Sequence, residues 1–237
     1  MNRRLYSIDV GNSSIGVGCS EQGRLSVRRV REPEEAAALI DGESVAISVA
    51  PVRLERLQVA LRAQGRAPAR LLERPPPQLD RSPAELLASA GADRLANALA
   101  LMPGPGIAVD AGTAVTIDVV DAEGIYRGGF IAAGPLAAST GLATVTARLP
   151  RLAGDPVPIV PGLETASALG AGLWGSAVGG VDLLVSRALL ALGRSGGVRV
   201  VATGGWGSQW AAASAHASID VVPDLVHLGI LRWAERA

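Results

Sequence analysis

One short pattern occurs twice in this chain, about one hundred residues apart: an apolar run that ends in Asp-x-Gly and a small hydroxyl residue. The first copy is SIDVGNS at Ser7–Ser13, and the second is AVDAGT at Ala108–Thr113. Each copy is followed by two further strand-like segments and then by segments of helical periodicity. The pattern therefore predicts a duplicated unit, in which two aspartates face one another across a cleft. A coincidental pair of ordinary hairpin turns is the alternative that the pattern alone leaves open.

The residue types in these turns suit a bound phosphate and a hydrated cation. An aspartate can hold a cation, and a glycine lets a ligand approach the backbone closely. Successive backbone N–H groups and the neighbouring hydroxyls can face phosphate oxygens. The turns are thus candidates for the two walls of a nucleotide site.

The wider pattern predicts an α/β chain of two domains, 1–103 and 104–237, divided at the breaker segment Pro103–Gly106. The predicted strands are Leu5–Val10, Ile15–Ser20, Arg24–Val30, Ser44–Val49, Ala69–Leu72, Ile107–Val109, Val115–Val120, Ile125–Ala132, Val198–Ala202 and Ile219–Val222. The predicted helices are Pro33–Ile40, Val52–Ala63, Pro83–Ser89, Gly91–Leu101, Gly134–Arg148, Glu164–Leu192 (one long or broken helix), Ser208–Ser214 and Asp224–Glu235. Exposed irregular loops are expected at Pro75–Pro77 and Arg151–Gly162.

The composition excludes several kinds of chemistry. The sequence has no lysine, which excludes a Walker-type phosphate loop and Schiff-base catalysis. A single cysteine, Cys19, excludes an internal disulfide, and two distant histidines, His216 and His227, make a histidine-centred triad unexpected. Aspartate, arginine, hydroxyls and backbone remain, and this inventory suits phosphoryl transfer.

Charge and hydropathy bear on location and partners. The formal net charge is zero, so we expect no binding to nucleic acid. No secretory signal is visible, and the longest uncharged run, Thr165–Val181, is shorter than the roughly 20 residues that span a bilayer. We therefore expect a cytoplasmic protein that does not enter a membrane. The Gly175-x-x-x-Gly179 spacing in that run predicts a buried, closely packed helix.

The ordered set DVGNSS, GADRLANALA, DAGTAVTIDVV, GGFIAAG, ATGG and PDLVHLGI resembles the type III pantothenate kinases. This family belongs to the superfamily of acetate kinases, sugar kinases, heat-shock-70 proteins and actin. The resemblance covers essentially the whole chain. It implies two ribonuclease-H-like domains of the actin-like ATPase superfamily fold with a cleft between them. It also implies a homodimer that uses ATP, Mg²⁺ and a monovalent cation, K⁺ or NH₄⁺, to phosphorylate pantothenate to 4′-phosphopantothenate, the first step of coenzyme A biosynthesis.

The resemblance also implies roles for individual residues. The catalytic proton acceptor would be Asp93, Asp9 would lie near Mg²⁺, and Asp110 would hold the monovalent cation. The ATP-binding residues would be Asp9, Val10, Gly11, Asn12, Ser13, Ser14, Ile15, Gly16, Thr113, Gly204 and Gly205, and the pantothenate-binding residues Gly91, Ala92, Asp93, Arg94 and Thr165. Three of these residues also have a purely structural interpretation, which the sequence leaves open. Asp93 can cap a helix, Arg94 can form a surface ion pair, and Thr165 can be a helix N-cap.

Three departures from the family pattern leave other functions open. Pro83–Ala90 lacks the family's substrate-contacting tyrosine, Ala133 replaces a usual proline, and Trp206 replaces a usual acidic residue. One alternative is a nucleotide-binding regulatory or accessory protein that has lost catalysis, and another is a kinase of a different small alcohol. The last aspartate of DAGTAVTID, Asp118, receives no role beyond support of its neighbours.

Overall fold

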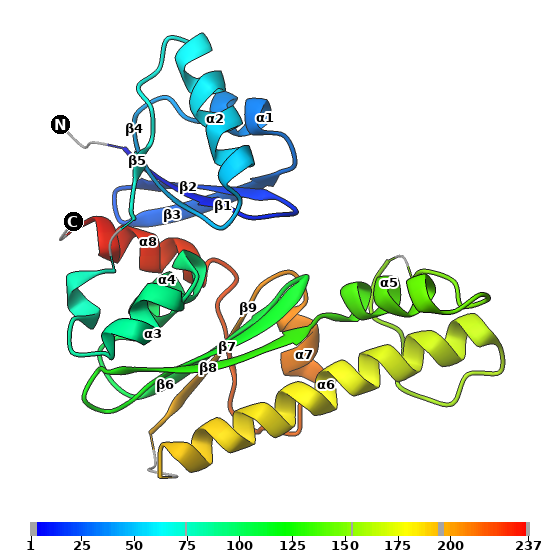
Figure 1. Cartoon of the computed structure of the whole chain (residues 1–237). Coiled ribbons are helices and arrows are strands. Elements are labelled where there is room, and N and C mark those ends of the chain that lie inside the picture. The colour runs from blue at the N-terminus through cyan, green and yellow to red at the C-terminus, as the bar shows by residue number, and fades with distance from the viewer. Residues whose placement is uncertain (1–3, 74, 153, 194–196, 236–237) are drawn as a thin grey trace. The chain divides into compact units, whose positions relative to one another are not determined.

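The structure is a computed structural model that describes residues 4–73, 75–152, 154–193 and 197–235. The chain separates into two compact units (Figure 1). The first unit comprises the described residues of Met1–Met102 and of Asp224–Ala237, and the second comprises those of Pro103–Pro223. This division differs from the predicted 1–103 and 104–237 at the end of the chain, because the last helix belongs to the first unit.

Each unit is built around a five-stranded sheet, and the two sheets have the same topology. The strand order is β3-β2-β1-β4-β5 in the first unit and β8-β7-β6-β9-β10 in the second. In both, the first three strands form an antiparallel meander, the fourth strand pairs in parallel with the first, and the fifth pairs in parallel with the fourth. The duplication predicted from the repeated Asp-x-Gly pattern is confirmed. The strands are β1 Leu5–Val10, β2 Ile15–Glu21, β3 Arg24–Val30, β4 Glu43–Ser48, β5 Arg70–Leu71, β6 Gly106–Ala111, β7 Ala114–Val120, β8 Tyr126–Ala133, β9 Arg199–Thr203 and β10 Asp220–Val221.

In the first unit, helices cover both faces of the sheet. Alternate residues of β1, namely Tyr6, Ile8 and Val10, form a core with α1 and α2. The helices α4 and α8 pack against each other and against β4, and α8 also contacts β1. The side chains of Ser7 and Asp9 alternate with the core residues, so they face away from α1 and α2. The helical segments of this unit are α1 Pro33–Ala38, α2 Pro51–Ala63, the 3-10 turn Pro77–Leu79, α3 Ala84–Ser89, α4 Ala92–Leu101 and α8 Leu225–Ala234.

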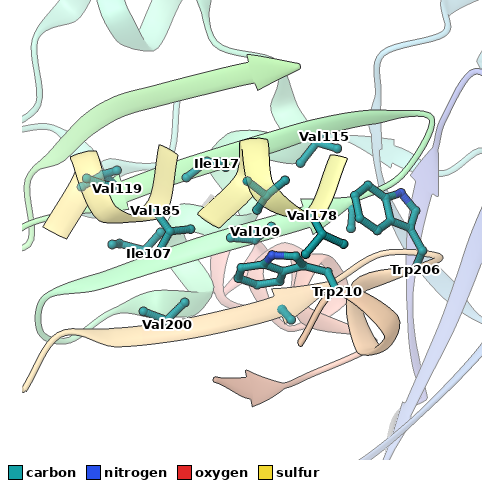
Figure 2. Close-up of a cluster of buried hydrophobic side chains, with 14 of the residues drawn as sticks. Ile107, Val109, Val115, Ile117, Val119, Val178, Val185, Val200, Trp206 and Trp210 are labelled. Atoms are coloured by element: carbon teal, nitrogen blue, oxygen red, sulfur yellow. The ribbon is translucent and has the colours of Figure 1, made fainter. Parts of the chain in front are cut away.

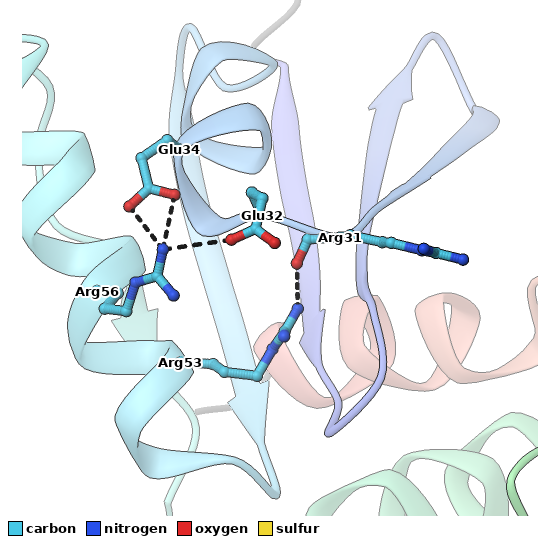
Figure 3. Close-up of polar contacts among 5 residues, drawn as sticks. All are labelled: Arg31, Glu32, Glu34, Arg53 and Arg56. Atoms are coloured by element: carbon cyan, nitrogen blue, oxygen red, sulfur yellow. Dashed lines mark hydrogen bonds and ion pairs between the residues drawn. The ribbon is translucent and has the colours of Figure 1, made fainter.

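Exposed ion pairs join α1 and α2 at the surface of the first unit (Figure 3). The Arg56 guanidinium lies 3.1 Å from Glu34 and 3.3 Å from Glu32, and Arg53 donates a hydrogen bond to the Arg31 carbonyl. Exposed pairs of this kind contribute about 0–1 kcal/mol. The apolar core beneath them therefore carries most of the packing energy between these helices.

In the second unit, one face of the sheet carries a continuous apolar core. Valines and isoleucines of β6 and β7 pack against Val178 and Val185 of α6 and against Trp210 of α7 (Figure 2). Both helices therefore lie on the same face of this sheet. The helices of this unit are α5 Pro135–Val145, α6 Thr165–Ala191 and α7 Gly207–Ala213.

Helix α6 is unbroken over 27 residues and is the one described helix long and apolar enough to cross a membrane by length and composition. Core helices of soluble proteins pass the same test. Its carboxylate Asp182 accepts hydrogen bonds from Trp210 Nε1 at 2.9 Å, Ser214 Oγ at 2.6 Å and the Ala215 amide at 2.8 Å. A polar network thus ties the middle of α6 to the end of α7.

The predicted close packing at Gly175-x-x-x-Gly179 is wrong for its second glycine. A methyl group at Gly175 would lie 3.0 Å from Ile159, but one at Gly179 would meet no atom within 4 Å. Only 28% of the most apolar 18-residue window of α6 is buried. One face of the helix is therefore packed, and the opposite face is exposed.

Other differences from the predicted elements are small. The 3-10 turn begins at Pro77, inside the proline run that was expected to be irregular, because proline fits the first position of a helical turn. Strand β8 extends through Ala133, which pairs with Ala114. An alanine keeps the backbone N–H that a proline at this position would lack.

Candidate nucleotide and phosphate site

The first Asp-x-Gly turn connects β1 to β2 in the first unit. Asp9 is half-buried near the end of β1, directly opposite Gly16 of β2. The Gly11 amide donates to the Ser14 carbonyl at 3.1 Å and closes the turn, which leaves Asn12 and Ser13 exposed. A partly accessible carboxylate thus stands beside an exposed polar turn, as a phosphate or cation site requires.

The second turn connects β6 to β7 in the second unit and has a similar closure. The Gly112 amide donates to the Ala114 carbonyl at 3.1 Å, and Thr113 is exposed at the tip. Asp110 pairs with Thr116 on one side and with Thr203 on the other. In both turns the glycine amide donates to a later carbonyl, and the second turn closes over one residue fewer than the first.

Gly204 brings a second predicted nucleotide residue next to Asp110. It adopts a φ of +85°, which favours glycine, and a methyl group there would lie 2.4 Å from Asp110 Oδ1 and 2.7 Å from the Ala111 amide nitrogen. A methyl group at Gly205 would meet nothing within 4 Å. The second unit thus joins Asp110 to the glycine turn after β9, with open space beside Gly205.

Trp206 holds this glycine turn against the Asp-x-Gly turn, which the sequence did not predict. Its Nε1 donates to the Gly112 carbonyl at 2.9 Å, and its amide donates to the Ala111 carbonyl at 3.1 Å. Its ring is buried and meets Trp174 of α6 edge to face at 5.4 Å. Trp206, which replaces the family's acidic residue, therefore fixes the backbone of the turn. This role depends on contacts that form only in the folded structure.

Asp118 also acquires a structural role. Its carboxylate is fully buried and accepts the Tyr126 hydroxyl at 2.7 Å, across from β7 to the start of β8. The Thr116 hydroxyl lies 3.4 Å from the same carboxylate. Asp118 thus links neighbouring strands beside Thr116, the residue that pairs with Asp110, in keeping with the support role expected of it.

The predicted substrate segment forms the start of α4 in the first unit. Gly91 is the N-cap residue, and Asp93 lies in the first turn with Oδ1 accepting the Arg94 amide at 2.8 Å. Gly91 has no side chain to cap the helix, and the Asp93 carboxylate instead satisfies a first-turn amide, in keeping with its predicted helix-start role. A methyl group at Gly91 would lie 2.5 Å from the same Oδ1, so glycine leaves room for the carboxylate. Asp93 and Arg94 are both half-buried.

Thr165 is exposed at the first position of α6, where the capping residue is Glu164. The Glu164 side chain and the Ser167 hydroxyl form a reciprocal capping box with the backbone, so the N-cap interpretation of Thr165 is wrong. The start of α6 lies beside α5 (Figure 1). The substrate role of Thr165 therefore stays a prediction.

His227, which the sequence left without a role, is completely buried beneath the first unit's sheet. Its Nδ1 lies 2.9 Å from the Ser7 hydroxyl on β1, and its Nε2 has no hydrogen-bond partner among the described residues. Burial lowers the pKa of His227 to about 4, and the nearby Arg29 guanidinium adds to this effect, whereas a hydrogen bond with Ser7 opposes it. The imidazole is thus neutral at physiological pH.

We expect the buried His227 imidazole to make the free energy of unfolding depend on pH. Its pKa falls from 6.5 to about 4 on folding, so between these values the unfolded chain binds a proton that the folded chain does not. Stability should fall as the pH drops from 6.5 towards 4, by up to about 3 kcal/mol from this group. Urea unfolding of the metal-free protein and of His227→Asn across this range would measure it. Parallel pH curves for the two proteins would contradict the prediction.

The structure assembles the predicted residues in three places: Asp9–Gly16 and Gly91–Arg94 in the first unit, and Asp110, Thr113, Gly204 and Gly205 in the second. Among the described residues, no three His, Cys, Asp or Glu side chains gather as metal ligands. Mg²⁺ usually binds through one or two carboxylates together with substrate phosphates and water, so a single accessible aspartate beside a polar turn fits that ion.

Comparisons with known proteins agree with this architecture. Over 98% of both chains, the structure matches a protein from Campylobacter jejuni assigned to the Baf family of transcriptional activators, with a TM-score of 0.64 and 22% identity. It also matches the archaeal actin homologue Ta0583 over 100% of both chains, with a TM-score of 0.50 and 13% identity. These likenesses concern the fold alone. They confirm two ribonuclease-H-like domains of the actin-like ATPase superfamily fold.

The sequence comparisons narrow this class. A family model described as Type III pantothenate kinase matches residues 5–187. The type III pantothenate kinase of Phenylobacterium zucineum (strain HLK1) is 39% identical over 130 residues, which are 54% of this chain and 49% of that protein. The chain spans about half the length of the curated relatives it matches. The chain belongs to the type III pantothenate kinase family.

Proposed function

We propose that this protein transfers the γ-phosphoryl group of ATP to the primary hydroxyl of pantothenate and forms 4′-phosphopantothenate. The observation that carries the proposal is the family match over residues 5–187, because it contains all three motifs that bear charge: Asp9–Gly16, Gly91–Arg94 and the DAGTAVTID segment. The reaction would supply the first step of coenzyme A biosynthesis. We propose the cytoplasm as its location, since ATP is the phosphate donor.

In this proposal, both Asp-x-Gly turns contribute contacts to the nucleotide. The backbone amides that follow Gly11 in the first turn, the hydroxyls of this turn and the Thr113 hydroxyl would contact phosphate oxygens. Gly204 and Gly205 would leave room for the adenosine. Asp9 would hold Mg²⁺ through water, and Asp110 would hold K⁺ or NH₄⁺. When bound, these cations neutralise charge on the phosphates during transfer.

Asp93 would act on the pantothenate hydroxyl. A carboxylate that hydrogen-bonds this hydroxyl can orient it and accept its proton as the transfer completes. Its position in the first turn of α4 supports this role, because Oδ1 is fixed by the Arg94 amide while the side chain stays half-buried. The Arg94 guanidinium is suited to bind a carboxylate or hydroxyl oxygen of the substrate.

A cavity of about 800 Å³ in the first unit reaches the start of α4. Its wall includes Ala92 at the start of α4, apolar side chains such as Leu54, the cation Arg62 and the two carboxylates Glu55 and Glu73. This volume lies in the range of small-molecule sites. The two carboxylates outnumber the cation, so the charge of this wall does not select for the pantothenate carboxylate; the place of the cavity beside Ala92 is what links it to the predicted substrate segment.

A coupled assay of ADP release, with pantothenate, Mg²⁺ and K⁺, tests the proposal. Turnover that depends on pantothenate would exclude the non-catalytic regulatory or accessory role. Turnover with another small alcohol but not with pantothenate, in a panel of substrates, would replace the proposed substrate. Nucleotide binding without any turnover would favour the regulatory alternative.

We further propose that the protein is a homodimer formed through the exposed face of α6. Small and apolar residues recur on this face at spacings of three, four and seven, which is typical of two helices in contact. Its exposed members are Gly172, Ser176, Gly179, Leu183 and Leu190. Leu183 is 56% exposed and Leu190 is 44% exposed in the single chain.

The dimer proposal predicts the effect of a charge on this face. Leu183→Glu would place a carboxylate in the proposed interface, where its desolvation is unfavourable, and should shift the protein from dimer to monomer. Sedimentation equilibrium would measure the mass. Leu228→Glu, at another exposed leucine on α8, is the control and should leave the mass unchanged. A monomeric wild-type protein, or a dimeric Leu183→Glu variant, would contradict the proposal.

A further inference from the structure

The His227 ring lies along β2 above two glycines. A methyl group at Gly18 would lie 2.9 Å from Nδ1, and a methyl group at Gly16 would lie 2.6 Å from Nε2. Any larger residue at either position would displace the imidazole. The absence of side chains at Gly16 and Gly18 therefore makes the space that this histidine occupies on the sheet.

The two ring nitrogens belong to different rows of the sheet. Nδ1 lies at the row in which Ser7 pairs with Gly18, and it is satisfied by the Ser7 hydroxyl at 2.9 Å. Nε2 lies at the row in which Gly16 pairs with Asp9 on one side and with Arg29 on the other. The β-carbons of directly opposed residues are about 4.5–5.5 Å apart, so Nε2 lies about one side-chain position from Asp9.

Three polar groups therefore surround Gly16 on one face of the sheet. Asp9 contributes a carboxylate, and Arg29 contributes a guanidinium whose Nη1 would be 3.7 Å from a methyl group at Gly16. His227 contributes a fully buried nitrogen without a hydrogen-bond partner among the described residues. Leaving such a group unsatisfied costs about 1–3 kcal/mol, so a fold that keeps it there favours a partner from outside the chain.

We propose that His227 is a further binding residue of the Asp9 site, where its Nε2 hydrogen-bonds the water molecules and phosphate oxygens that a magnesium nucleotide brings to that carboxylate. The inference rests on the proposed function. The tautomer of the neutral imidazole decides whether Nε2 donates or accepts a hydrogen bond. If Nε2 carries the proton, it can donate to a phosphate oxygen or to a water molecule. If Nδ1 carries the proton, Nε2 can accept a hydrogen bond from a water molecule. The last helix of the chain thereby contributes directly to a site formed by its first two strands.

A matched pair of substitutions separates this role from a purely structural one. In His227→Asn, the side-chain amide places a polar atom at the position of Nδ1, so the contact with Ser7 remains. This side chain has no atom at the position of Nε2, beside Gly16. In His227→Gln the amide group extends to the position of Nε2. We expect His227→Asn to weaken binding of Mg·ADP about tenfold, as measured by titration calorimetry, and His227→Gln to recover most of this loss.

The controls decide between the two roles. His216→Asn, at the other histidine of the chain, should bind Mg·ADP as the wild type does; its Nε2 lies 3.1 Å from the Asp182 carbonyl in the second unit. Wild-type affinity in His227→Asn would overturn the inference. Equal losses in the Asn and Gln variants would also overturn it, because they would assign His227 to packing alone.

A measurement on the unmodified protein avoids any dependence on folding of the variants. With ¹⁵N-labelled histidine, the two imidazoles can be followed separately, and addition of Mg·ADP should shift the Nε2 resonance of His227 but not that of His216. If calorimetry detects Mg·ADP binding and the His227 resonance does not move, the inference is wrong. If the wild-type protein binds no Mg·ADP at all, the proposed function itself fails.

Discussion

Asp93→Asn is expected to lower kcat for pantothenate phosphorylation by about a hundredfold to ten-thousandfold, the range associated with loss of a general base. An amide at this position can still hydrogen-bond the substrate hydroxyl, but it cannot accept the proton. The Arg94 amide would retain its partner at 2.8 Å, because the amide oxygen of asparagine replaces Oδ1. The start of α4 should therefore keep its conformation, and the dissociation constant for ATP should stay near that of the wild type.

The measurement compares kcat from coupled ADP release with the affinity for ATP from calorimetry. Asp80→Asn serves as the control, since Asp80 is an exposed carboxylate of the same unit and lies outside the motifs. Loss of kcat in Asp93→Asn alone would support the assignment. A near-normal kcat would remove Asp93 as the proton acceptor, and a large loss of ATP affinity would place it in the nucleotide site instead.

Much of the fold could be predicted because the information is local. The meanders after Asp9 and Asp110 follow from apolar alternation and from turn residues, and both occur as predicted. The position of the last helix could not be predicted in this way. The sequence of an apolar helix of ten residues does not indicate which of the two sheets the helix packs against. The contacts of Gly229 and His227 are known only from the folded unit.

The same distinction between local and long-range information applies to the residues of the candidate site. Residues whose chemistry depends on a local turn, such as Asn12 and Thr113, can be proposed from the sequence, and the structure leaves both exposed at the tips of turns. Trp206 and His227 were not identified, because each acts through groups distant in sequence: the Gly112 carbonyl in one case, and Ser7 and Gly16 in the other. Single-sequence patterns do not record such long-range contacts.

Gly229→Ala is expected to destabilise the first unit by more than about 3 kcal/mol, above the usual range for an overpacked core. Gly229 lies in α8, where a methyl group would be 1.8 Å from the Ala96 carbonyl oxygen of α4 and 2.4 Å from its carbonyl carbon. These are backbone atoms, so no rotamer change relieves the clash and the two helices must separate. Thermal unfolding of a chain of this length should shift downwards by roughly 10 °C.

The packing of α8 against α4 should also make activity depend on the stability of the first unit. The Arg232 guanidinium of α8 donates to the carbonyls of Leu99 at 2.9 Å, Ala100 at 3.0 Å and Met102 at 2.6 Å, so α8 also fastens the end of α4. If Gly229→Ala displaces α4, its first turn moves with it, and kcat should fall even at temperatures where the variant is fully folded. Gly141→Ala, within α5 at a position where a methyl group would meet no atom within 4 Å, is the matched control and should be neutral or stabilising by up to about 1 kcal/mol. Equal melting temperatures for Gly229→Ala and the wild type would show that α8 and α4 do not pack at this distance.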